Sequence, residues 1–270
     1  IYDIIDKLDV NKTDSVTISG GEPTLHPQFL DIVEYAQKAG LYVTILSNGE
    51  NFSNETLIKE MKNKIYNKKL RVITTLHSQN SYEHEAINGV KGSFQRSIKG
   101  LKNIYELGAK IEIKHCLTKE NIEDLLLFYK YYSEIFPEDV NIQLCGIDYI
   151  GIKKNKLKQE FLSAKNIKKN LEELFEYYLK QKKLGSKRKL YAINIPLCAC
   201  DPYYWSLMSL KKDRLYNGYT DPYSGFTTDV QKNVGVDSRY CSNCKVYNIC
   251  NGTYKTAFDY FGSELVTPFI

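Results

Sequence analysis

The chain has 270 residues, of which 43% are hydrophobic and 26% are charged, and this balance excludes a wholly disordered protein. Its net charge of +5 is too small and too evenly spread to predict nucleic-acid binding. No run approaches the roughly 18 consecutive apolar residues that a membrane span needs, so no membrane partner is expected.

Strand and helix patterns alternate along the first 150 residues. The strands are predicted from β-branched and apolar runs, and the helices from apolar residues that share one face. In chain order we expect strand 15–19, helix 26–40, strand 41–47, helix 54–61, strand 70–76, helix 93–107, strand 110–117, helix 122–136 and strand 139–145. The segment with His77, His84 and Gly89 is expected to be a loop. The alternation predicts a parallel α/β sheet, open or curled into part of a barrel, with ligands bound at the carboxyl ends of its strands.

The composition changes twice after residue 150. Residues 151–190 are rich in Lys around a helix expected at 164–179, which is interpreted as a solvated bridging helix with a basic face. From Tyr191 the chain is rich in Cys, Tyr, Asp and Gly and has few apolar runs, which is typical of a small domain held together by metal. We therefore expect three parts, 1–150, 151–190 and 191–270.

The sequence Ser19-Gly20-Gly21-Glu22-Pro23 stands where the first strand should end. Two glycines let the backbone approach a ligand closely, and the Glu22 carboxylate suits an ammonium group. The alternative is a tight βα turn with a proline at the start of a helix. The spacing matches neither the dinucleotide fingerprint nor the P-loop.

The seven cysteines are an odd number and fit a disulfide framework poorly. Cys241, Cys244 and Cys250 are spaced as CxxCx5C, which provides three corners of a tetrahedral metal site. Free thiolates of this kind indicate a reducing compartment, so a cytoplasmic protein is expected. Spacing alone does not choose between zinc and an iron–sulfur cluster.

The fourth ligand must come from Cys198 or Cys200. Cys198 is favoured because it ends the apolar run YAINIPL, where a strand end would hold it rigidly. Cys200 lies further into a polar loop and is expected to be a spectator.

These motifs together resemble a radical S-adenosylmethionine (SAM) enzyme. The resemblance rests on SGGEP after a strand, Asn48-Gly49 after the next strand, the stretch INGVKGSFQRSIKGLKNIYELG, and the terminal CxxCx5CxG, and it spans nearly the whole chain. The tail CSNCKVYNICNGTYKTAFDYFGSELVTPFI, preceded by IPLCACDPYYW, is similar to maturases with an auxiliary cluster, most of all the His-Xaa-Ser system radical SAM maturase of the C type. It implies a parallel partial TIM barrel, here N-terminally truncated, with a small Cys-rich C-terminal domain.

The resemblance also implies roles for individual residues. Gly20, Gly21 and Glu22 match the GGE motif that holds the amino group of SAM, and Ser47 and Asn48 would border the same ligand. Thr75-Leu76-His77 stands where many relatives have Ser-x-Asp, and Lys114 stands where many have Arg, so charge is kept at Lys114 but bidentate geometry is not. Further matches are Asn121, after the strand of Lys114, and the backbone of 143–147, near the adenine.

The family's CxxxCxxC loop, which binds the catalytic [4Fe–4S] cluster, is absent from the printed sequence. Because the chain also lacks an initial Met, we expect that loop to lie upstream in a longer protein, and we expect this segment alone to form no 5′-deoxyadenosine. The opening IYDIIDKLDV lacks the pattern of a secretory signal.

The implied function is modification of a ribosomally made peptide by a 5′-deoxyadenosyl radical that abstracts hydrogen. The implied cofactors are SAM, the catalytic cluster, and an auxiliary [4Fe–4S] cluster on Cys198, Cys241, Cys244 and Cys250. The implied partners are the peptide and an electron donor such as flavodoxin or ferredoxin. Two alternatives remain: a radical SAM enzyme acting on a small molecule in cofactor biosynthesis, and a nonenzymatic, zinc-stapled binding module.

Overall fold

The computed structural model describes residues 1–8, 13–150, 161–211, 218–220, 227–229 and 233–270. They form two compact units, one from Ile1 to Lys114 and one within residues 115–270. The first part of the expected basic stretch, 151–160, lies outside the described residues. The division into three parts at residues 150 and 190 stays a prediction.

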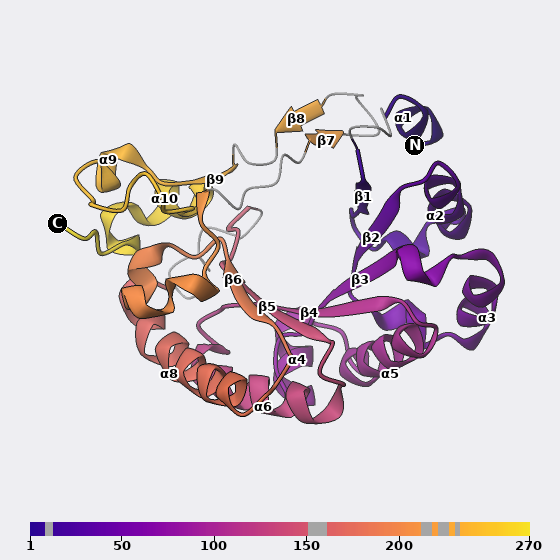
Figure 1. Cartoon of the computed structure of the whole chain (residues 1–270), viewed down its shortest axis with the longest axis horizontal. Helices are drawn as coiled ribbons and strands as arrows, with labels where there is room; N and C mark the ends of the chain where they lie inside the picture. Colours follow the sequence, from indigo (N-terminus) through magenta and orange to yellow (C-terminus); the bar gives the residue numbers. More distant parts are fainter. Residues whose placement is uncertain (9–12, 151–160, 212–217, 221–226, 230–232) are drawn as a thin grey trace. The chain divides into compact units, whose positions relative to one another are not determined.

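The first unit carries the start of a parallel sheet with helices beside it (Figure 1). Its strands are β1 (Ser15–Ile18), β2 (Tyr42–Ser47), β3 (Leu70–Thr75) and β4 (Lys110–Cys116), and β4 runs into the second unit. Its helices are α1 (Tyr2–Asp6), α2 (Phe29–Lys38), α3 (Glu55–Lys64), α4 (Ser81–Asn88) and α5 (Ser93–Glu106). Neighbouring strands are paired in parallel, as the alternation of patterns predicted.

The helix expected at 26–40 is confirmed as α2, and its sequence explains its packing. Phe29, Ile32, Val33 and Ala36 share one face and are all buried. Burying a side chain of the size of Phe, Ile or Val stabilises the fold by roughly 1.5–3 kcal/mol. Gly40 follows the helix with φ 94°, a conformation that glycine adopts without steric cost.

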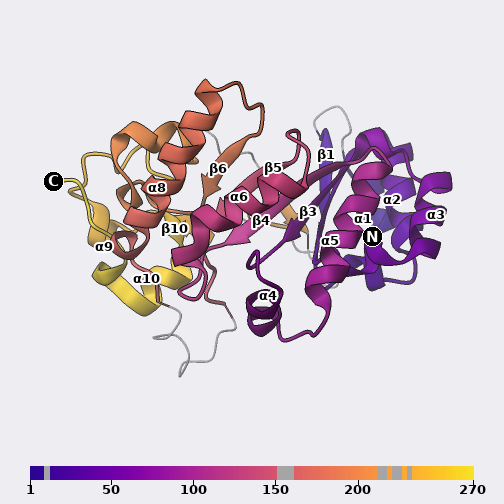
Figure 2. The same cartoon turned by 90° about the horizontal axis from the view of Figure 1, so that it is seen from below.

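The segment that was expected to be a loop contains a helix, so that part of the prediction was wrong. Figure 2 shows α4 as a short helix between β3 and α5. The Asn80 side chain caps it by accepting hydrogen bonds from the amides of Tyr82 (2.8 Å) and Glu83 (3.4 Å). Only His84 of this helix is buried, so the periodic apolar signal that identifies longer helices is missing.

Helix α5 approaches the turn after β2 very closely at Gly100. A Cβ atom built on Gly100 would lie 2.1 Å from the carbonyl oxygen of Gly49, which is backbone and cannot rotate away. The glycine is therefore required by packing, although glycine disfavours a helix interior by about 1 kcal/mol relative to Ala.

We expect Gly100→Ala to destabilise the first unit by about 1–3 kcal/mol, because overpacking outweighs the gain in helix propensity. Hydrogen exchange of α5 and β2 measures this. The exposed Lys102→Ala variant of the same helix is the control and should change stability little. A Gly100→Ala variant that is more stable than the wild type would show that the close approach is not required.

The second unit continues the sheet with β5 (Asn141–Cys145) and β6 (Leu190–Ile193), again paired in parallel. The strand order is β1-β2-β3-β4-β5-β6, so the sheet has one strand more than the five predicted. The 3-10 turn Ile122–Asp124 and helix α6 (Leu125–Ile135) occupy the place of the expected helix 122–136. The parallel α/β fold class is confirmed.

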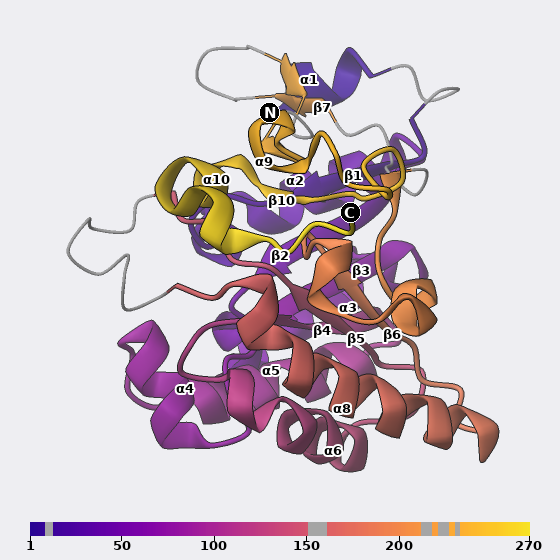
Figure 3. The same ribbon diagram turned by 90° about the vertical axis from the view of Figure 1, so that its left-hand side faces the viewer.

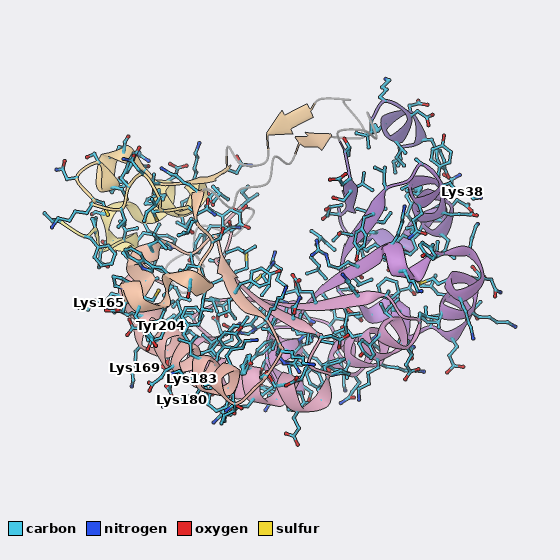
Figure 4. All side chains as sticks on the ribbon, in the orientation of Figure 1. Lys38, Lys165, Lys169, Lys180, Lys183 and Tyr204 are labelled. Atoms are coloured by element: carbon cyan, nitrogen blue, oxygen red, sulfur yellow. The ribbon has the colours of Figure 1, made fainter. Side chains whose placement is uncertain are left out.

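Helix α8 (Ala164–Lys183) lies between β5 and β6 in the chain and beside α6 in space (Figure 3). It is four residues longer than the expected helix 164–179. Ser163 caps it in a reciprocal capping box with Asn166. Its basic face is exposed as predicted, and Figure 4 labels four of the lysines on it, Lys165, Lys169, Lys180 and Lys183.

A buried arginine ties β6 to the end of α6. The Arg188 side chain is 2% exposed, and its guanidinium donates to the carbonyl oxygens of Phe136 (2.7 Å), Ser133 (3.2 Å) and Val140. These carbonyls at and after the helix end lack helical partners, so the guanidinium satisfies them.

The C-terminal residues contain only short elements. They are β7 (Gly218–Thr220), β8 (Thr227–Asp229), β9 (Val234–Gly235), α9 (Ser238–Cys241), β10 (Thr253–Tyr254) and α10 (Lys255–Phe261). Strands β9 and β10 pair antiparallel, as do β7 and β8. None of the helices in the described part of the chain is long and apolar enough to cross a membrane.

Candidate functional site

A cavity of about 380 Å³ opens in the first unit at the carboxyl ends of its strands. All eight residues that the sequence predicted as cofactor contacts line it: Gly20, Gly21, Glu22, Ser47, Asn48, Thr75, His77 and Lys114. They come from the ends of four strands, because the carboxyl ends of parallel strands meet at one edge of a sheet.

Glu22 is the most firmly held of these residues. One carboxylate oxygen, Oε1, accepts hydrogen bonds from the Thr24 hydroxyl (2.6 Å), the Thr24 amide (3.1 Å) and the Ser47 hydroxyl (2.8 Å). The other oxygen, Oε2, accepts one bond from the amide of Asn48 (2.8 Å). A carboxylate has about four lone-pair positions, two on each oxygen, so Oε2 keeps acceptor capacity for a ligand. Glu22 thus caps the following 3-10 turn and lines the cavity at the same time.

The two glycines before Glu22 leave open space at the cavity wall. A Cβ atom built on Gly20 or Gly21 would meet no other atom within 4 Å. Gly20 has φ 150°, which side chains other than hydrogen rarely allow. The backbone at this turn is therefore accessible to a ligand, and its peptide groups face unfilled space.

The turn after β2 forms a fixed part of the wall. The Ser97 hydroxyl of α5 donates to the carbonyl oxygen of Asn48 (2.7 Å), and the Asn48 side chain accepts from the amide of Glu50 (2.9 Å). Glu50 lines the cavity and is paired with Arg96 at 2.6 Å. This network orients the turn from two sides before any ligand binds.

His77 and His84 lie together in the wall, with ring centroids 5.4 Å apart. Burial lowers the pKa of His77 to about 4, and the neighbouring His84 lowers it further. Both imidazoles are therefore neutral near pH 7. A neutral imidazole replaces the carboxylate that many radical SAM relatives are expected to carry at the position of His77.

Lys114 is the register partner of Thr75 across β3 and β4, and both line the cavity. The cavity therefore carries a carboxylate, Glu22, and an ammonium group, Lys114, on different strands. Such a pair complements a ligand that itself carries an ammonium and a carboxylate, as an amino acid does.

The expected contacts from the second unit are not among the residues that line this cavity. The Asn121 side chain binds its own loop, accepting from the Thr118 amide (2.8 Å) and donating to the Cys116 carbonyl oxygen (3.0 Å). At the end of β5, the Gln143 side chain donates to the Tyr191 hydroxyl (3.0 Å).

A second, small cavity in the second unit is lined by Cys198, Cys241, Cys244 and Cys250. The remaining lining is mostly apolar. All seven cysteines of the chain are free thiols, and all lie within the described residues. No three His, Cys, Asp or Glu side chains of the described part are gathered closely enough to hold a single metal ion. The four thiols thus share a cavity without being clustered around one point.

Backbone amides point at two of these sulfur atoms. The Cys250 sulfur accepts from the amides of Leu197 (3.4 Å) and Gly252 (3.3 Å), and the Cys198 sulfur accepts from the amide of Thr267 (3.5 Å). Burial nevertheless raises the pKa of Cys198 to about 11, so a metal that binds here must displace a proton from that thiol.

Cys200 does not line this cavity. It is fully buried near Glu172 and Lys168 of α8, and burial raises its pKa to about 12. The next amide, that of Asp201, donates to Glu172 at 2.6 Å, which holds this stretch against the helix.

Comparison with known proteins identifies the first half of the chain. Residues 1–131 match the Radical SAM superfamily. Among curated relatives, the Fe-coproporphyrin III synthase of Methanosarcina barkeri is 27% identical over 132 residues, which are 48% of this chain and 32% of that protein. The mycofactocin maturase MftC of Mycolicibacterium smegmatis is 31% identical over 126 residues, 46% of this chain and 30% of that protein.

A solved radical SAM structure has a similar fold. Streptococcus suis SuiB bound to the precursor peptide SuiA superposes with a TM-score of 0.54 at 19% identity, over 67% of this chain and 39% of that one. The matched regions span about a third of the length of the two curated relatives. These likenesses show a radical SAM domain and its α/β fold.

Several residues of the radical SAM cavity were not predicted from the sequence. Glu50, His84, Asn88, Val90 and Ser97 all line it. Asn88 and Ser97 belong to the stretch INGVKGSFQRSIKGLKNIYELG, so the resemblance could have indicated them. Glu50 pairs with a residue 46 positions away, and no local signal indicates that contact.

Proposed function

We propose that the chain is part of a radical SAM enzyme that modifies a ribosomally made peptide, and that it binds SAM in the cavity of the first unit. The observation that carries the proposal is the Glu22 carboxylate, held by three neighbouring residues with one oxygen still able to accept. Such a fixed anion suits the ammonium group of the SAM amino-acid moiety. The electropositive partner for its carboxylate would be Lys114.

The chain's own residues would bind and orient this cofactor. Gly20 and Gly21 would offer backbone peptide groups, Ser47 and Asn48 would border the ligand, and Thr75 and His77 would contact it from the end of β3. When bound, SAM supplies a radical that removes a hydrogen atom from the substrate, and the catalytic [4Fe–4S] cluster supplies the electron. The protein holds the cofactor still and keeps water away from it.

A peptide substrate is proposed because relatives of this fold act on peptides by name. MftC is a maturase, and SuiB is bound to a precursor peptide. The closest type we propose is the His-Xaa-Ser system maturase of the C type, with an electron donor such as flavodoxin or ferredoxin in the cytoplasm. In this proposal residues 1–150 form the SAM-binding part, 151–190 a linker and 191–270 an auxiliary-cluster domain.

We also propose an auxiliary [4Fe–4S] cluster on Cys198, Cys241, Cys244 and Cys250. Support comes from the shared cavity, from the amides directed at two of the sulfurs, and from a donor set of four thiols, which iron–sulfur clusters prefer. The wide arrangement of the thiols also argues against a preformed site for a single zinc ion.

Glu22→Gln should weaken SAM binding by about 1–3 kcal/mol, the usual loss when an ammonium loses its charged partner. Isothermal titration calorimetry of the full chain measures this, and thermal unfolding checks that the variant still folds.

Ser47→Ala is the matched control, because it removes one hydrogen bond to Glu22 and leaves the charge in place. Its affinity should fall less than that of Glu22→Gln. Equal affinity in the Glu22→Gln variant and the wild type would assign Glu22 to capping of the 3-10 turn alone.

A second candidate function is radical SAM chemistry on a small molecule. It is favoured by the likeness to Fe-coproporphyrin III synthase, whose name gives a porphyrin product. A short peptide gene beside the coding sequence would favour the peptide substrate, and a nonenzymatic zinc module would be favoured if the C-terminal cysteines took up zinc and rejected iron.

A further inference from the structure

The wall of the SAM cavity contains a hydrogen bond between two histidines that no cofactor role requires. His84 lies on α4 and is 1% exposed. Its Nδ1 atom accepts a hydrogen bond from the backbone amide of His77 at 3.2 Å. An imidazole nitrogen accepts only when it carries no proton, so neutral His84 here has its proton on Nε2.

The segment between β3 and α4 is short and is held at few points. The Ser78 hydroxyl donates to Glu83 (2.6 Å) and accepts from the amide of Asn80 (3.0 Å), which fixes the start of α4. The bond to His84 holds the loop one residue earlier, at His77, which is the residue that lines the cavity. His84 also packs against Phe94 of α5, with ring centroids 5.6 Å apart, so its ring is fixed from a second side.

We propose that His84 is a positioning residue that holds His77 in the wall of the cavity, and that it does so only while its imidazole is neutral. Protonated His84 has donors at both nitrogens and no acceptor for the His77 amide. Acid would therefore release the loop at His77 and lower the affinity for SAM. This inference rests on the proposed SAM site and adds a residue and a pH dependence to it.

The charged and titratable groups around His84 determine the direction of the effect. They are His77 before α4, Glu85 on α4, and Glu50 of the turn after β2, which is itself paired with Arg96. Burial is the largest influence and lowers the pKa of His84, while Glu85 and Glu50 raise it. Because the pKa in the folded state is lower than in the unfolded state, the neutral form is stabilised by folding, and this stability is lost as the pH falls through the folded-state value.

The test combines two measurements on the full chain between about pH 5 and pH 8, the range where histidines titrate. Calorimetry measures the affinity for SAM, and hydrogen exchange, corrected for its intrinsic pH dependence, measures opening of the loop at residues 76–80 without ligand. For the wild type we expect affinity to fall about 3–10-fold on acidification, which is the contribution of one hydrogen bond, and loop exchange to rise in parallel.

Three variants separate this mechanism from a merely structural role. His84→Asn places a non-titrating oxygen near the position of Nδ1, so affinity at high pH should be kept and the pH step should disappear. His84→Phe has no acceptor and should bind weakly at every pH, and thermal unfolding checks its folding. His77→Asn should keep the step, because the bond to His84 uses the backbone amide of residue 77.

A flat pH profile in the wild type, or a step that persists in His84→Asn, overturns the inference. If the wild type binds no SAM at any pH, the proposed site fails and the inference fails with it. That outcome is distinct from a flat profile with intact binding, which removes only the role of His84.

Discussion

Cys198→Ala is expected to abolish cluster binding in residues 191–270, whereas Cys200→Ala is expected to keep it. After anaerobic reconstitution the wild-type chain should hold about four irons with equal acid-labile sulfide, as a [4Fe–4S] cluster requires. The Cys198 thiol lines the cavity with the three thiols of the CxxCx5C motif, and the Cys200 thiol does not. Iron and sulfide analysis with absorption spectra of both variants measures the difference.

The two cysteines are a matched pair, since both are buried and they stand two residues apart. Cys200 would have to leave its place beside Glu172 to reach the cavity, which would break the hydrogen bond of the Asp201 amide. Loss of iron in Cys200→Ala, with iron retained in Cys198→Ala, would reverse the assignment. Tight uptake of one Zn²⁺ with rejection of iron would contradict the auxiliary cluster altogether.

Much of the fold could be predicted from the sequence because its central strands carry a strong local signal. The run LYVTILS is β-branched and apolar, and β2 covers Tyr42–Ser47 with four of its six residues buried. The helix caps are equally local: Asn54 accepts from the amide of Thr56 at 2.9 Å, as the expected helix start at residue 54 required.

The elements that the sequence did not reveal have weak or ambiguous local signals. Helix α4 buries only His84, so its residues show no apolar period. Strand β6 is four residues long and follows a charged stretch, so its apolar run was assigned to the C-terminal part. Its place beside β5 depends on pairing with residues about 48 positions away, including Ile142 with Leu190.

The candidate site follows the same division. The eight predicted contacts stand next to strand ends, where the family motif and the topology both indicate a ligand. The groups that hold them come from elsewhere: Ser97 reaches Asn48 across 49 residues, and Arg96 reaches Glu50 across 46. Such partners are set by the packing of α5 on the turn after β2, which no periodic pattern encodes.

Gly252 is the position where a single methyl group should be least tolerated. It has φ 72°, and a Cβ atom built there would lie 1.8 Å from the carbonyl oxygen of Gly235 and 2.6 Å from the amide nitrogen of Val236. Both atoms are backbone. Gly252 also donates its amide hydrogen to Cys250, so displacement of this residue would disturb a proposed cluster ligand.

We expect Gly252→Ala to destabilise the second unit by about 3–5 kcal/mol, the sum of left-handed strain and overpacking. Gly185→Ala is the matched control: Gly185 has φ 100° but open space around its Cβ, so only strain of about 1–2 kcal/mol applies. Denaturant unfolding followed by fluorescence of Trp205 measures both variants, because this single tryptophan donates to the Leu197 carbonyl oxygen (3.1 Å) and packs against Phe269 in the same unit. Equal losses in the two variants would mean that β9 and β10 separate easily, and the close approach at Gly252 would then contribute nothing to holding the cysteine cavity.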